Sequence, residues 1–244
     1  MFSIVTVSIS CAQINLKNIK IPTTIPTTIP TTIPTTAKAA ELTDTDIVSG
    51  LKEALTQGSK KASDSLNKTD GFNKNLKVRI PFPEDCQKVA TRLRELGFGK
   101  KVDDFELKLN RAAEQAAKEA SPIFVNAIKQ MTFTDAKDIL KGADTAATGY
   151  LRKTTYSSLY NAFSPHITTA LNNTLAAKSW KDLTTTYNKL PTTKTKVQTD
   201  LVKYTTHKAL KGLFILVAEE ELKIRKDPMA RVTDILKKVF GSNN

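Results

Sequence analysis

The fold is decided by residues 200–226, which read DLVKYTTHKALKGLFILVAEEELKIRK. In a helix, at about 100° per residue, four further apolar side chains fall within about 60° of Leu210. They are Leu213, Phe214, Val217 and Ile224, while Ile215, Leu216 and Leu222 cover other sides. A helix that is apolar on nearly all sides is buried, so this stretch predicts a helix inside the protein.

Three consecutive glutamates interrupt this apolar helix. Glu221 falls about 20° from Leu210, inside the apolar stripe, and Glu220 falls about 80° away, at its edge. A buried carboxylate needs a partner or a raised pKa, and Arg225 follows Glu221 by four residues, in the favourable order. The pattern has two interpretations, which are a polar network in the core and a ligand-binding or catalytic pocket.

A second polar strip lies on the helix expected over about residues 101–120. Glu106, Asn110 and Glu114 follow one another at intervals of four, beside a face made mostly of alanine, and Arg111 adjoins them. If this strip meets the glutamates and arginine of the buried helix, the seven residues form one candidate polar pocket. The alternative is a solvated helix face with ordinary salt bridges.

Helical spacing of apolar residues continues through most of the remaining chain. The expected helices cover about residues 47–66, 83–96, 101–120, 123–131 and 134–142, a segment from 144 that Pro165 breaks, 179–190, 200–226 and 228–241. Residues 78–83 (VRIPFP) are expected to cross the helices as an extended segment, because a residue before proline avoids the helical region. No segment alternates with period two over a sufficient length. The sequence therefore predicts an all-α fold with a single domain, residues 44–241, of about eight or nine helices, some kinked by proline.

Residues 1–11 (MFSIVTVSISC) form an apolar, uncharged leader that ends at Cys11. This leader has the apolar stretch and the small residues of an export signal but lacks its basic start. The sequence SISC resembles a degenerate bacterial lipobox, in which the cysteine is diacylated, so Cys11 is the predicted lipid attachment site. Ordinary signal cleavage after Ala12 and a short buried strand or helix are the alternatives.

Residues 12–43 form the expected extended linker, in which Ile-Pro-Thr-Thr occurs four times over residues 21–36. Proline at every fourth position removes a backbone donor and fixes φ, which excludes a helix or an inner strand. At about 3.1 Å per residue, the sixteen residues of the repeat in a polyproline-II-like conformation reach roughly 50 Å. The repeat is expected to be a stalk that holds the body away from a membrane, and a linker without a role is the alternative.

The net charge of +13 arises from 37 Lys and Arg against 24 Asp and Glu, and it lies entirely in residues 51–244. Lysine outnumbers arginine by 30 to 7. This balance suits diffuse attraction to an anionic partner better than bidentate recognition of phosphate or bases. Anionic lipid, an envelope polymer or a protein are therefore the expected partners, and nucleic acid is disfavoured.

The sequence contains no constellation that indicates a metal, a cofactor or a catalytic nucleophile. His166 and His207 lack a His or Glu at metal-ligand spacing, Cys11 and Cys86 form no CxxC pair, and no Gly-x-Ser-x-Gly occurs. No catalytic residue, metal site or cofactor is therefore predicted. The longest apolar run of the body, residues 213–218, is too short to span a bilayer.

Several stretches of the body resemble one known family. They are VRIPFP from Val78, NRAAEQAA from Asn110, MTFTDA from Met131, YNKLP from Tyr187, and AEEE from Ala218 together with RKDPMAR from Arg225. In this order, over about residues 47–241, the chain is similar to the bacterial domain of unknown function 4197 family. The resemblance implies a helical, exported envelope protein, often with a lipoprotein-like leader, and it implies no known activity.

Leader, stalk and body together predict a non-catalytic binding module of the bacterial envelope. The module would be periplasmic, anchored to a membrane through a lipid at its N-terminus, and basic on its helical surface. The alternative is a small-ligand carrier or an enzyme that uses the polar pocket between the helices at 101–120 and 200–226.

Overall fold

The computed structural model describes residues 43–172, 180, 185, 200–227, 231, 233–234, 237 and 239. These residues belong to one compact unit, Leu42–Asn244. The predicted leader with Cys11 and the Ile-Pro-Thr-Thr repeat lie outside the described residues, as do most residues of the expected helices 179–190 and 228–241.

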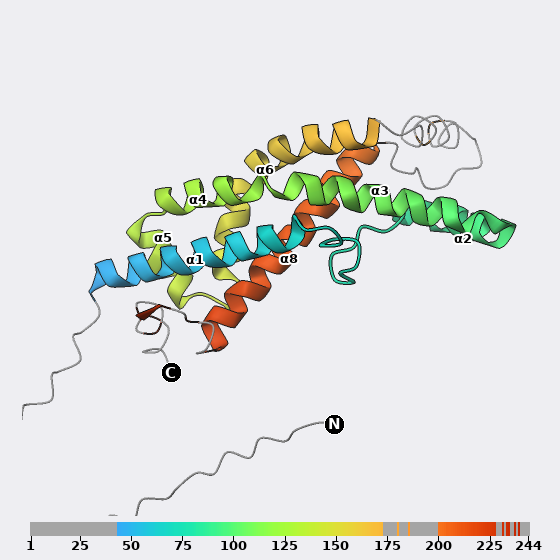
Figure 1. Cartoon of the computed structure of the whole chain (residues 1–244). Coiled ribbons are helices and arrows are strands. Elements are labelled where there is room, and N and C mark those ends of the chain that lie inside the picture. Colours follow the sequence, from blue (N-terminus) through green and yellow to red (C-terminus); the bar gives the residue numbers. More distant parts are fainter. Residues whose placement is uncertain are drawn as a thin grey trace, which may run out of the picture. The chain divides into compact units, whose positions relative to one another are not determined.

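The described residues form helices and their connections, without a strand, so the predicted all-α class is confirmed (Figure 1). Six α-helices have nine or more residues, and α2 is a shorter one. They are α1 (Asp44–Leu66), α2 (Gln87–Leu93), α3 (Gly99–Ala117), α4 (Ala120–Gln130), α5 (Phe133–Lys141), α6 (Ala146–Asn172) and α8 (Leu201–Lys226). Among the described residues this number is lower than the expected eight or nine.

Helix α8 is the buried helix that the sequence predicts. Its N-cap is Asp200, whose carboxylate accepts a hydrogen bond from the backbone N–H of Lys203 at 2.9 Å. Leu210, Leu213 and Phe214 are almost completely buried. Helices α6, α1 and α3 all pack against α8, and in Figure 1 it runs obliquely past α1 and α3. The apolar stripe therefore anchors three helices at once.

Residues 67–83 connect α1 to the short 3-10 helix Glu84–Cys86 that precedes α2, and they contain no helix. Four of their apolar side chains are buried in the core. They are Phe72, Val78, Ile80 and Phe82. We call residues 70–82 the crossing segment, because they pass over both α3 and α8. Its approach to α8 depends on Gly212, where an added Cβ would lie 2.9 Å from the Phe72 ring and 3.0 Å from Val78 Cβ.

Pro122 and Pro165 differ in their positions within the helices. The chain turns at residues 118–119, and Pro122 then lies in the first turn of α4, where a missing N–H costs no helical hydrogen bond. The predicted break at Pro165 is wrong, because α6 continues through this residue to Asn172. Phe163 and Ile167 are fully buried on either side of it, and this burial offsets the hydrogen bond that proline removes.

We expect Gly212→Ala to destabilise the protein by about 1–3 kcal/mol, because the new Cβ overpacks the crossing segment. Gly149→Ala is the matched control, since a Cβ there meets no atom within 4 Å. Alanine at this helical position should stabilise the protein by about 0.5–1 kcal/mol. Urea denaturation followed by circular dichroism measures both values. A stabilised Gly212→Ala variant would contradict the tight contact.

Candidate functional site

The predicted polar strip of α3 points inward, toward the crossing segment. Glu106, Asn110 and Glu114 are all buried, and Asn110 has no exposed surface. The crossing segment contains no strand that could pair its backbone, and buried backbone groups left without partners are costly. Turns within the segment pair some of its N–H groups, and the three side chains of α3 supply partners for others.

Asn110 holds the middle of the crossing segment at Ile80. Its Oδ1 accepts a hydrogen bond from the backbone N–H of Ile80 at 2.8 Å, and its Nδ2 donates to the Ile80 carbonyl at 2.9 Å. Nδ2 also donates to the carbonyl of Glu106, four residues earlier on α3, at 2.7 Å. One side-chain amide thus pairs with both backbone groups of Ile80, as a neighbouring strand would.

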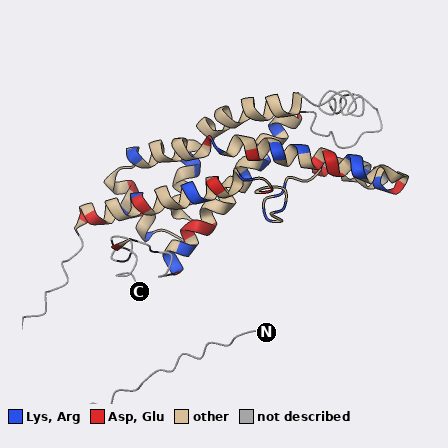
Figure 2. Ribbon diagram, in the orientation of Figure 1, with Lys and Arg blue, Asp and Glu red and all other residues tan. Residues whose placement is uncertain are grey.

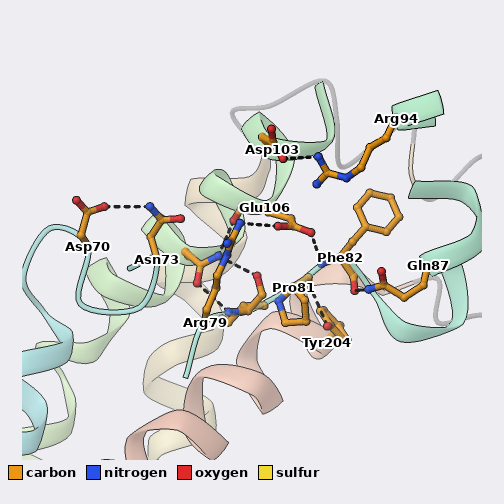
Figure 3. A network of polar contacts seen from close by, with 12 residues as sticks. Asp70, Asn73, Arg79, Pro81, Phe82, Gln87, Arg94, Asp103, Glu106 and Tyr204 are labelled. Atoms are coloured by element: carbon orange, nitrogen blue, oxygen red, sulfur yellow. Dashed lines mark hydrogen bonds and ion pairs between the residues drawn. The ribbon is translucent and has the colours of Figure 1, made fainter. Parts of the chain in front are cut away.

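Glu106 holds the end of the crossing segment and orients Arg79 (Figure 3). One carboxylate oxygen accepts from the backbone N–H of Phe82 at 3.0 Å, and the other pairs with Arg79 Nη2 at 2.8 Å. The Phe82 ring packs against Phe105 and Trp180, with centroid distances of 5.1 and 5.2 Å. Polar and aromatic contacts therefore fix the same point of the chain.

Glu114 holds the start of the crossing segment. Its Oε1 accepts from the backbone N–H groups of Phe72 and Asn73, at 3.1 and 3.2 Å, and its Oε2 pairs with Arg111. Arg111 also pairs with Asp70 at 2.7 Å. Hydrogen bonds to Glu114 and then to Asp70 raise the pKa of Arg111. Hydrogen bonds from Lys74, Asn73 and Arg111 hold the pKa of Asp70 well below its ordinary value.

A second cluster lies near the end of α8 and binds the ends of two other helices. Glu221 accepts from the backbone N–H groups of Ala147 and Thr148, at 3.0 and 2.8 Å, in the first turn of α6. Arg225 pairs with Glu221 at 2.9 Å and donates to the carbonyl of Ile139, near the end of α5, at 2.8 Å. A carboxylate at a helix N-terminus and a cation at a C-terminus both suit the helix dipoles.

Glu220 faces α1 and has its own partners, Lys223 at 2.6 Å and Lys61 at 2.9 Å. Burial raises the pKa of this carboxyl, but the hydrogen bonds from Lys223 and Lys61 lower it more, so the pKa lies below its ordinary value. Glu220 is therefore held in its charged form by two lysines from two helices.

The structure places the seven candidate residues in separate groups, each with its own partners. Glu106, Asn110, Arg111 and Glu114 contact the crossing segment, whereas Glu221 and Arg225 contact α5 and α6, and Glu220 contacts α1. The cavity beside Glu221 and Arg225 has a volume of about 20 Å³ and is otherwise lined mainly by apolar side chains, which leaves room for about one water molecule. The contacts described match the polar-network interpretation and do not join the groups into one pocket.

Sequence reasoning missed a basic groove between the crossing segment and α8. Four cationic side chains line it, from Lys77, Arg79, Lys208 and Lys211, and its volume is about 200 Å³. The available signals were Arg79 inside the VRIPFP stretch and two lysines three positions apart on α8. They could not be combined, because no periodic pattern shows that residues 77–81 lie against α8.

No group of three His, Cys, Asp or Glu side chains suited to a metal ion occurs among the described residues. His166 lies 3.1 Å from Glu119, and His207 shares a hydrogen bond with the Tyr156 hydroxyl at 2.6 Å. Within the residues that the structure describes, no helix is both long enough and apolar enough to cross a bilayer.

Fold and site define an all-α protein in which polar side chains of two helices hold an irregular segment and the ends of neighbouring helices. The chain belongs to the family described as protein of unknown function (DUF4197), whose model matches residues 41–241. This match confirms the resemblance found in the sequence. No curated protein and no solved structure matches the chain.

We expect Asn110→Ala to destabilise the protein by about 3 kcal/mol, because it leaves the buried N–H and C=O groups of Ile80 without partners. Gln115→Ala on the exposed side of α3 is the matched control and should change the stability by less than about 0.5 kcal/mol. Denaturant unfolding of both variants tests this role of Asn110. Equal stability of the two variants would contradict it.

Proposed function

We propose that this protein is a non-catalytic binding module of the bacterial envelope, which attracts an anionic partner through its basic helical surface. The observation that carries the proposal is the use of the buried carboxylates. Glu106, Glu114, Glu220 and Glu221 each pair with an arginine or lysine, and three of them also accept backbone hydrogen bonds.

Carboxylates engaged in this way are poor candidates for acid–base chemistry, because a general acid or base must lie within hydrogen-bond reach of a substrate, and these oxygens are buried against backbone N–H groups and cations. The carrier or enzyme alternative needs these groups to line an open pocket, and their contacts serve the fold instead. The surface charge instead favours binding to an anionic partner. Lys and Arg are spread along several helices (Figure 2), and residues 51–244 carry a net charge of +13. Such a distribution favours an extended anionic surface over one compact polyanion.

We further propose that Cys11 carries a lipid and that the repeat over residues 21–36 is the stalk between membrane and body. The apolar leader before Cys11 and the regular spacing of proline support this proposal. A tether of roughly 50 Å lets a basic body reach a membrane or envelope surface without insertion. The proposed location is the periplasmic side of the envelope.

Binding to vesicles tests the proposed partner class. The unacylated full chain (Cys11→Ser) should sediment with phosphatidylglycerol vesicles at about 50 mM salt and leave them at about 500 mM, because salt shortens the Debye length. Phosphatidylcholine vesicles are the control and should retain little protein. Binding that is absent, or equal on both vesicle types, contradicts an anionic lipid partner.

Metabolic labelling tests the proposed anchor. In bacterial cells, the chain should incorporate labelled palmitate and fractionate with membranes, and Cys11→Ser should lose the label and most of the membrane association. Cys86→Ala removes the other cysteine, which is buried, and should leave both unchanged. A Cys11→Ser chain that is labelled as before contradicts acylation at this residue.

A further inference from the structure

The basic groove is built from two walls, each held in place by contacts with the rest of the protein. The first wall is the crossing segment, in which Glu106 holds Arg79 and the Tyr204 hydroxyl donates to the Pro81 carbonyl at 3.2 Å. The second wall is the buried helix α8 near Gly212, which carries Lys208 and Lys211. Side chains on segments that such contacts hold in place lose less freedom when a ligand binds than side chains on unanchored loops do.

The groove carries more positive than negative charge. Lys77 pairs with Glu219 at 2.6 Å, Lys208 pairs with Glu84, and Arg79 pairs with Glu106. Among the residues the structure describes, Lys211 forms no ion pair. The Glu84 side chain is 72% exposed, so an anion that enters the groove can displace it at little cost.

The placement of the cations on two walls indicates the shape of the anion. A planar carboxylate is satisfied by one arginine fork, whereas a tetrahedral phosphate presents oxygen atoms in several directions. Here an arginine and a lysine come from one wall and two lysines from the other. We infer that the groove binds the phosphate group of an anionic ligand, which rests on the proposed function and names its ligand class.

A titration with inorganic phosphate tests the site on the full chain carrying Cys11→Ser. Amide NMR shifts should change mainly in residues 77–82 and 208–215, and acetate at equal ionic strength should cause smaller changes. The double variant Lys208→Gln/Lys211→Gln should bind phosphate about tenfold more weakly, because two nearby charges are lost.

The matched control is Lys108→Gln/Lys203→Gln, which removes two exposed lysines that do not line the groove and should bind phosphate as the parent chain does. Shifts scattered over all surface lysines, or equal weakening in both double variants, overturn the inference. Such a result would leave only diffuse charge attraction.

A gain of affinity provides a second test, which a loss of folding cannot imitate. Glu84→Gln removes the carboxylate that competes for Lys208 and should tighten phosphate binding several-fold. Asp138→Asn makes the same change of charge on α5 and should have little effect. Equal affinity of the two variants contradicts a ligand site beside Lys208.

Vesicles then separate the two sources of phosphate. If the ligand is a lipid headgroup, Lys208→Gln/Lys211→Gln should weaken binding to phosphatidylglycerol vesicles more than Lys108→Gln/Lys203→Gln does. If phosphate titrates the groove but vesicles do not bind, the groove inference stands for a soluble phosphate compound and the lipid proposal fails. If vesicles bind and both double variants behave alike, the proposed function stands and the groove inference fails.

Discussion

The constraint on which this structure depends is the backbone of the crossing segment. This segment lies against α3 and α8 without forming a helix or a strand, so the buried N–H and C=O groups that its own turns do not pair need other partners. Glu106, Asn110 and Glu114 provide them from successive turns of α3, and they contact Phe72, Ile80 and Phe82. A single helix face thereby replaces the neighbouring strand that an extended chain would otherwise require. The small side chain at Gly212 lets the same segment reach α8.

The buried charged groups fix the positions of the segments and helix ends that they contact more than they stabilise the fold. A buried ion pair offsets its desolvation cost only in good geometry and often contributes little to the net free energy of folding. Glu221 illustrates its other use, because its carboxylate caps α6 while Arg225 reaches the end of α5. Replacing the pair by apolar side chains could keep the volume filled, but it would remove the contacts that fix where these helices end. Glu221 and Arg225 both lie in stretches that resemble the family.

Helical periodicity was enough to predict α8, its burial and the pairing of Glu221 with Arg225, because both partners lie on one helix. The inward orientation of Asn110 could not be predicted in the same way. Its partner, Ile80, lies 30 residues away in a segment without periodicity, and the sequence contains no signal that joins them. The continuation of α6 through Pro165 has a similar cause, since tertiary burial of Phe163 and Ile167 outweighed a local rule.

Structure and surface charge are linked through the same side chains. Glutamates that bind backbone groups are buried, whereas most lysines are at the surface. The surface is therefore more positive than the net charge of the chain alone indicates. Arg79 connects the two regions. Its pairing with Glu106 ties it to the network of α3, and the same side chain forms part of the groove beside α8. The contacts that satisfy an unpaired backbone thus also fix a cation at the surface, where it can meet an anion.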